Sequence, residues 1–198
     1  MKQIFLIVGF LFLTGCSVTT PYVTEYRIDP KVAVAEKKDS LCRDKTVKIS
    51  QIFTSDLLMS KNMNYAGSGY DIHQYTESEW ANTPSRAISA ALIKSVREAA
   101  IFANVSSQRS RSRADLILET NVDTFMQYYT KDNSSSSVVV NFSFTLIDFK
   151  SGKVVASKMI QKEQKVDSVD AKGGVDALNN ALSEVLYETN SWLKSSCR

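Results

Sequence analysis

The sequence predicts an α+β fold, a two-layer sandwich in which two helices pack on one face of a mainly antiparallel sheet. Apolar and polar residues alternate over three long segments, 115–129, 137–149 and 153–166. The turns between them are short, which favours antiparallel pairing into a meander. Apolar residues at steps of three and four mark one helix before these segments and one after them. Both helices need an apolar surface to cover, and the alternating strands supply it.

Strands are also expected ahead of the first helix. Residues 46–52 alternate apolar and polar side chains, which is typical of a half-buried strand. Residues 58–65 and 70–75 flank Gly67 and Gly69, and glycine readily adopts the positive φ angles of tight turns. These two segments therefore predict a β-hairpin. No helix follows the two glycines directly, so they do not predict a phosphate-binding loop.

The two helices have recognisable starts. Thr83 and Pro84 suit the N-cap and first position of a helix that is expected to end near Ile101. A polar stretch, which we expect to be a loop, separates this helix from the first long strand. The second helix is expected over about 170–193, and Gly173-Gly174 near its start should weaken or delay its first turn.

The N-terminus has the layout of a secretory signal. Lys2 precedes an apolar run over residues 4–13, which is too short to cross a membrane because about 20 residues are needed. The Leu-Thr-Gly-Cys sequence that ends at Cys16 resembles the bacterial lipobox, in which the cysteine thiol receives a diacylglyceryl group before cleavage. The alternative is a conventional signal peptide that contains a cysteine by chance. The expected organisation is a lipoprotein signal peptide, a lipidated N-terminus with a tether, and a single α+β domain, over residues 1–15, 16–25 and 26–198.

Acyl chains on Cys16 would anchor the domain stably to a membrane without spanning it. Ser17 follows the cysteine, whereas Asp at that position is the inner-membrane retention signal of enteric lipoproteins. The expected location is therefore the periplasmic face of the outer membrane, with the inner membrane as the alternative.

Lipidation of Cys16 would leave Cys42 and Cys197 as a pair in an oxidising compartment, where a disulfide is the usual outcome. The alternative is two free thiols that lie too far apart to join, because the sequence shows no distances.

Composition argues against several classes of function. The 24 basic and 21 acidic residues give a net charge of +3, which offers no electrostatic case for binding nucleic acid. His73 is the single histidine, so a site built from several histidines is excluded and no cofactor or metal is expected. Glu77 and Glu79 are expected in an exposed loop, and the serines around Ser134 have no evident base to activate them. We expect no enzymatic activity.

Five residues are candidates for contact with a partner or a lipid. Trp80 and Tyr75 are of the types enriched at interaction hot spots, although a tryptophan before a helix more often packs in the core. Arg109, Arg111 and Arg113 could bind lipid phosphates or an acidic partner, with a solvated loop as the alternative.

Several motifs in this order after a lipobox resemble the ABC-type transport auxiliary lipoproteins. The shared landmarks are Tyr26 to Pro30, Trp80-Ala81 with Pro84, Ala114 to Leu116 with Leu118, Leu146 to Gly152, Ala177-Leu178 and Trp192-Leu193. Residues 63–75 depart from the family pattern, because this stretch is longer and richer in glycine.

The resemblance implies a non-catalytic part of a system that moves lipids between inner and outer membranes. Its partners would be a lipid-shuttling protein of the mammalian-cell-entry type and an ABC permease and ATPase, and a homo-oligomer is one way to line a passage. The chain has no Walker A pattern, so ATP hydrolysis is assigned to another subunit. The alternative is a lipoprotein that activates a peptidoglycan synthase or helps assemble an outer-membrane complex.

Overall fold

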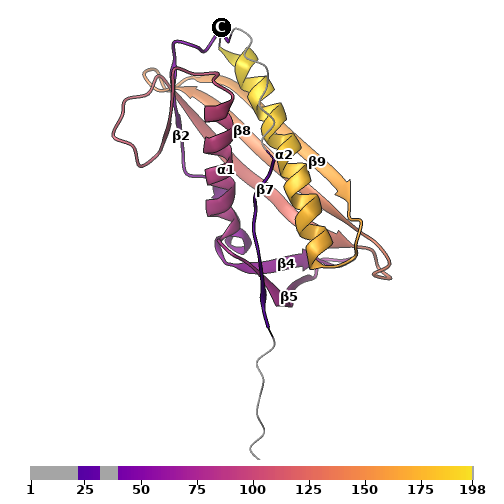
Figure 1. The fold of residues 1–198 in the computed structure, drawn as a ribbon. Helices are drawn as coiled ribbons and strands as arrows, with labels where there is room; N and C mark the ends of the chain where they lie inside the picture. The colour runs from indigo at the N-terminus through magenta and orange to yellow at the C-terminus, as the bar shows by residue number, and fades with distance from the viewer. Residues whose placement is uncertain (1–21, 32–39, 198) are drawn as a thin grey trace, which may run out of the picture.

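Two helices cover one face of a nine-stranded sheet in the computed structural model, which describes residues 22–31 and 40–197 (Figure 1). The predicted α+β class is confirmed. The strands are β1 (Thr24–Tyr26), β2 (Thr46–Ile49), β3 (Phe53–Thr54), β4 (Asn62–Ala66), β5 (Ile72–Trp80), β6 (Asn104–Ser107), β7 (Leu116–Tyr129), β8 (Ser136–Asp148) and β9 (Val154–Lys165). The helices are α1 (Pro84–Glu98) and α2 (Ala171–Ser196), and a short 3-10 helix, η1, spans Asp56–Met59.

The predicted meander forms one side of the sheet, with β9 as its edge strand. β7 pairs antiparallel with β8, and β8 pairs antiparallel with β9. Along β8 the burial alternates strictly, with Phe142 and Phe144 buried beneath the helices and Asn141 and Ser143 on the opposite face. The alternation in the sequence therefore reports which face carries the core.

The other edge of β7 is built from parallel pairs. β2, β3 and β4 each run parallel to part of β7, while β6 runs parallel to β2 and β1 runs parallel to β5. Only the β4–β5 hairpin is antiparallel on this side. The sheet is thus mixed, with its longest pairs antiparallel. Parallel neighbours need long crossover connections, and α1 lies in the connection that returns the chain from β5 to β6.

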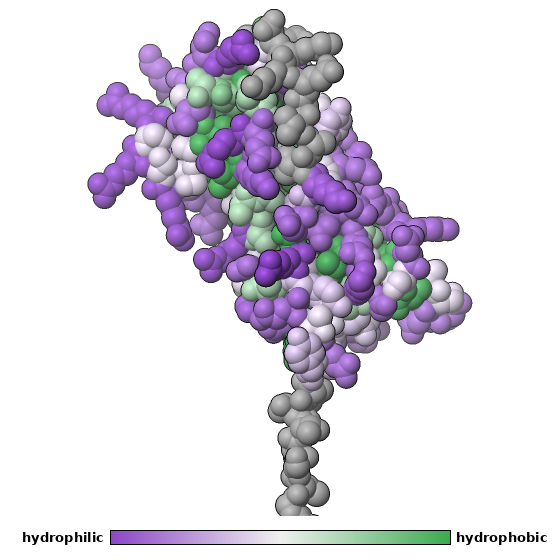
Figure 2. All heavy atoms as spheres, viewed as in Figure 1, coloured by the Kyte–Doolittle hydropathy of each residue, from purple (hydrophilic) through white to green (hydrophobic). Residues whose placement is uncertain are grey.

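The core lies between the sheet and the two helices. α1 buries Ile88, Leu92 and Val96, and α2 buries a stripe that includes Leu182 and Leu186. The two helices also meet directly, where a buried polar pair joins Ser95 to Asn190. The solvent side of the helical layer is mostly hydrophilic, with small apolar patches between polar side chains (Figure 2). Binding on this side would therefore depend strongly on polar groups.

Some local expectations need correction. The polar stretch after α1, residues 106–113, was expected to be a loop, but its first two residues belong to a strand, β6, that pairs with β2. Glu77 and Glu79 lie in strand β5 and not in a loop. α1 ends at Glu98, earlier than Ile101, and Ala100 takes a positive φ of 49° just beyond its end. Pairing with a strand that is distant in the sequence explains the first difference, pairing with β4 explains the second, and the turn at Ala100 explains the third.

The two glycines at the start of α2 do not delay the helix, contrary to the expectation from their low helix propensity. α2 begins at Ala171, and the Asp170 carboxylate accepts a hydrogen bond of 2.7 Å from the Gly173 N–H. A Cβ atom at Gly173 would overlap the backbone carbonyl of Ser168, and one at Gly174 would overlap the side chain of Gln127. Close packing against the preceding loop and β7 thus accounts for both glycines.

Cys42 and Cys197 form a disulfide in the structure, with their Cα atoms 5.2 Å apart. Both side chains are buried, and the bridge joins the segment before β2 to the end of α2 across 155 positions of sequence. It therefore links the end of α2 covalently to the segment that precedes β2.

Replacing Gly173 by Ala should destabilise the protein by about 2 kcal/mol or more, because the new Cβ would collide with backbone that cannot rotate away. Gly69→Ala is the matched control, since its Cβ would approach only the Asp71 carboxylate at 3.8 Å. Denaturant unfolding of both variants measures the difference. Equal stability of Gly173→Ala and wild type would contradict the close approach.

Reducing the disulfide should lower the free energy of unfolding by about 3–4 kcal/mol, because the bridge closes a long loop in the unfolded chain. The measurement compares denaturation with and without a reductant, using the Cys42→Ala/Cys197→Ala variant as a control that should not respond. Non-reducing mass mapping should recover the linked peptide. Two alkylatable thiols in the unreduced protein would contradict the bridge.

Candidate functional site

A groove of about 330 Å³ lies beside the first half of α1, next to the C-terminal ends of β2 and β6. Helix α1 forms one wall, the segment that follows β6 forms another, and the segment that follows β2 lies between them. Its lining residues are Ile49, Ser50, Gln51, Ile52, Met59, Ser85, Arg86, Ser89, Ala90, Ile93, Ser107, Gln108 and Arg109.

The helical wall follows from the spacing of residues along α1. Ser85, Ser89 and Ile93 recur at steps of four and so lie on one face of the helix, with Arg86 and Ala90 beside them. This face is distinct from the buried stripe that contacts the sheet. The groove therefore uses the side of α1 that the core does not need.

The other walls are held together by a hydrogen bond. The Gln51 N–H donates to the Gln108 side-chain oxygen at 2.9 Å, which joins the segment after β2 to the segment after β6. Ile52 is almost fully buried and Met59 is about half exposed, so apolar surface is present between the polar walls. The groove combines an apolar part with polar groups around it.

Positive charge and hydrogen-bond donors dominate these polar groups. Arg86 comes from α1 and Arg109 from the loop after β6, and no Asp or Glu of the described residues lines the groove. Neither guanidinium group has an ion-pair or hydrogen-bond partner among residues 22–31 and 40–197. The arrangement suits an anionic group and lacks the nucleophile and base of a hydrolytic site.

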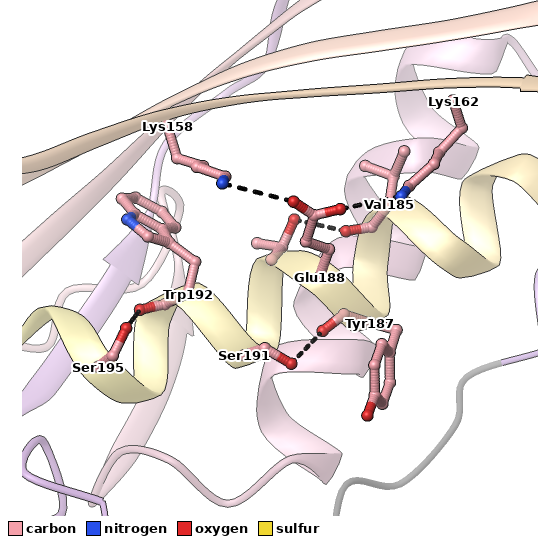
Figure 3. Close-up of polar contacts among 9 residues, drawn as sticks. Lys158, Lys162, Val185, Tyr187, Glu188, Ser191, Trp192 and Ser195 are labelled. Carbon is pink, nitrogen blue, oxygen red and sulfur yellow. Dashed lines mark hydrogen bonds and ion pairs between the residues drawn. The ribbon is translucent and has the colours of Figure 1, made fainter.

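In a second hollow, beside α2, Lys162 and Glu188 form an ion pair (Figure 3). Glu188 of α2 lies between two lysines of β9, 2.9 Å from the Lys162 nitrogen and 3.5 Å from the Lys158 nitrogen. The hydrogen bond from Lys162 is the main reason why the pKa of Glu188 is lowered. Tyr187 points away from this cluster, as Figure 3 shows. These lysines hold α2 on β9 and already have an anionic partner.

The three predicted arginines separate in the structure. Arg109 lies in the groove, and Arg111 and Arg113 are exposed in the same loop without lining it. Only the start of this loop therefore lines the groove, and the rest is partly or fully exposed to solvent. Arg86 was not predicted as a binding residue, because the prediction for this helix rested on its apolar stripe alone. The polar face of the same helix, where Arg86 lies between Ser85 and Ser89, could have indicated it.

Trp80 does not offer a surface for a partner. Its side chain is 4% exposed and its ring lies 6.2 Å from that of Phe125, so it packs in the core at the foot of α1. Its burial supports the alternative of core packing for Trp80. Trp192, near the end of α2, is partly buried and its ring lies close to that of Phe144.

Tyr75 is likewise occupied within the protein. Its hydroxyl donates to the Gln127 side-chain oxygen at 3.0 Å and shares a hydrogen bond of 2.5 Å with the Tyr129 hydroxyl. Burial, and then the bond to Tyr129, raise the pKa of Tyr75 far above its usual range. This residue is better described as a structural link between β5 and β7 than as a contact for a partner or lipid.

The remaining sequence candidates fall outside the groove. His73 is exposed and stacks on Tyr65, and the described part of the chain holds no group of three or more His, Cys, Asp or Glu that could bind a metal ion. Cys16 lies outside the described residues. Within those residues, no helix is long and apolar enough to cross a membrane.

Replacing Glu188 by Gln should lower the melting temperature at neutral pH, by an amount that corresponds to no more than about 1 kcal/mol for so exposed a pair. Because the pKa is lowered from 4.5 in the folded protein, the stabilisation is present above pH 4.5 and is lost as the pH falls through the folded value. Melting curves across pH measure this. Glu77→Gln, at an exposed position, is the control, and a difference that persists in strong acid would contradict the ion pair.

Comparisons with known proteins agree with this fold. The chain is similar to a crystal structure of a protein from Xanthomonas campestris, with a TM-score of 0.79 and 17% identity over 88% of this chain and 96% of that chain. It is also similar to the crystal structure of an uncharacterised protein, with a TM-score of 0.67 and 13% identity over 87% of this chain and 99% of that chain. At these identities the likeness shows the fold alone. No curated protein sequence matched.

A match to a family model identifies the protein family, which the similar structures alone do not show. The model described as the ABC-type transport auxiliary lipoprotein component matches residues 26–188, a range that includes every strand from β2 to β9, all of α1 and most of α2. The chain therefore belongs to the family of ABC-type transport auxiliary lipoproteins.

Proposed function

We propose that this protein is an outer-membrane-anchored periplasmic lipoprotein that serves a lipid transport system linking the inner and outer membranes. In that system it would be a non-catalytic auxiliary component, working with a mammalian-cell-entry-type lipid-shuttling protein and an ABC permease and ATPase. The observation that carries the proposal is the family match, which begins ten residues after the cysteine of a lipobox-like sequence.

The start of the domain supports a position close to the membrane. Six residue steps separate Cys16 from Tyr22, and an extended chain of this length reaches at most about 22 Å. β1 then pairs with β5, with Tyr26 opposite Trp80, and the Ala81 N–H donates to the Tyr26 carbonyl at 2.7 Å. The tether thus enters the fold at a defined place, at the foot of α1.

Such a short tether favours a docking station at the membrane over a protein that reaches across the periplasm. A lipoprotein that activates a peptidoglycan synthase would need to reach a partner anchored in the opposite membrane. The role assigned to this chain is binding, and the energy for transport would come from the ATPase of the same system. The free surface of the domain would dock the periplasmic part of the shuttling protein.

Crosslinking of the lipidated protein in its native membranes, followed by affinity purification, tests this function. A mammalian-cell-entry-type protein should be recovered, together with permease or ATPase subunits. Recovery of a peptidoglycan synthase with no transporter subunit would overturn the proposal in favour of the activator role.

The Cys16→Ala variant provides the matched control for the anchor. It should leave a folded domain that no longer fractionates with the outer membrane, because the acylated thiol is lost. Circular dichroism checks the fold, and density-gradient separation of the membranes locates the protein. Unchanged outer-membrane fractionation would refute the lipid anchor.

A further inference from the structure

We propose that the groove beside α1 binds the phosphate group of a lipid head group, with Arg86 and Arg109 as its principal ligands. The two arginines line the same groove from different elements, α1 and the loop after β6. This inference rests on the proposed function, because it assumes a domain held close to a membrane surface.

Charge is the first support. Among the described residues, the groove lining carries two guanidinium groups and no carboxylate, and neither guanidinium group has a partner there. The β9 lysines differ in this respect, since Glu188 already neutralises them. Guanidinium groups bind phosphate through paired N–H donors, so two free arginines facing one groove favour a phosphate ligand.

The hydroxyl groups of the lining favour phosphate over a single carboxylate. Ser50, Ser89 and Ser107 each contribute a hydroxyl with no side-chain hydrogen bond to the described residues. Together with the arginines they provide more donors than the two oxygens of a carboxylate can use. A phosphate ester, which has more acceptor oxygens, satisfies more of them.

Size and apolar surface indicate that the phosphate belongs to an amphiphile. A groove of about 330 Å³ is at the lower end of the range for small-molecule sites, so it suits a head group and not a complete two-chain lipid. Ile52, Met59 and Ile93 line it beside the polar groups. These side chains could contact the glycerol and the first carbons of an acyl chain, while inorganic phosphate would leave them uncovered.

The location of the groove fits a ligand at the membrane. Ser85 and Arg86 belong to the first turn of α1, only a few residues after Trp80, which pairs with Tyr26 at the start of the domain. Figure 1 shows this end of α1 near the β4–β5 end of the molecule, where the described chain begins, and opposite the C-terminus. The part of α1 that lines the groove is therefore near the end of the domain where the described chain begins.

A titration of the mature lipoprotein, held in neutral detergent micelles, tests the site with dihexanoylglycerophosphate as the probe. Saturable shifts of the Arg86 and Arg109 guanidinium NMR signals are expected. Arg86→Gln and Arg109→Gln should each weaken binding about tenfold, as expected for the loss of one charge-assisted contact. The matched control, Lys131→Gln/Lys150→Gln, removes charge from two exposed turns and should leave the affinity unchanged.

Two further ligands identify the source of the phosphate. Inorganic phosphate should bind at least about tenfold more weakly than the probe, because it leaves the apolar lining uncovered. Dihexanoylglycerol, which lacks phosphate, should not shift the arginine signals. Equal binding of inorganic phosphate would overturn the lipid assignment, and wild-type affinity in both arginine variants would overturn the site.

The outcome is independent of the test of the proposed function, because the titration contains no transporter subunit. Loss of probe binding with transporter subunits still captured would reject only the groove. Probe binding without any captured transporter would reject only the transport role. Unchanged melting temperatures of the arginine variants would show that altered binding does not come from unfolding.

Discussion

The burial of the α2 stripe on the β7–β8–β9 meander is the contact on which the rest of the structure depends. Phe142 and Phe144 of β8 are almost fully buried, and Leu182 and Leu186 of α2 belong to the same buried core. Burial of each such side chain contributes about 1.5–3 kcal/mol, so this one layer provides much of the driving force for folding. β7 in turn carries β2, β3 and β4 on its other edge, which extends the sheet to α1.

Polar contacts fix how the parts meet around this apolar layer. Gln127 of β7 is buried, and its amide group bonds to Ser136 of β8 and to the backbone carbonyl of Asp170, while its oxygen accepts from Tyr75 of β5. A buried amide without partners would be costly, so this network favours one register of β5, β7 and the start of α2. Gly174 completes the arrangement because it leaves room for the Gln127 side chain.

The same architecture separates the surfaces that hold the fold from those that are free to bind. Lys158 and Lys162 of β9 are paired with α2, Trp80 is buried, and the Tyr75 hydroxyl is hydrogen-bonded to Gln127. The guanidinium groups of the groove, which have no partner among the described residues, lie beside a face of α1 that the core does not use. A domain held near a membrane can thus present cationic side chains without loss of internal ion pairs, which is consistent with a binding role for a transport auxiliary lipoprotein.

Local pattern was enough to determine the meander, both amphipathic helices, the β4–β5 hairpin and the family resemblance, because periodicity, caps and turns act over a few residues. The tertiary structure alone decided the parallel pairing of β2 with β6 and β7, the strand β6 at the start of a polar stretch, the burial of Trp80 and the hydrogen bonds of Tyr75. It also decided which arginines share a groove. Each of these features depends on contacts between segments that are distant in the sequence. The hydrophobic period and the residue types of a segment do not indicate which distant segment it will contact.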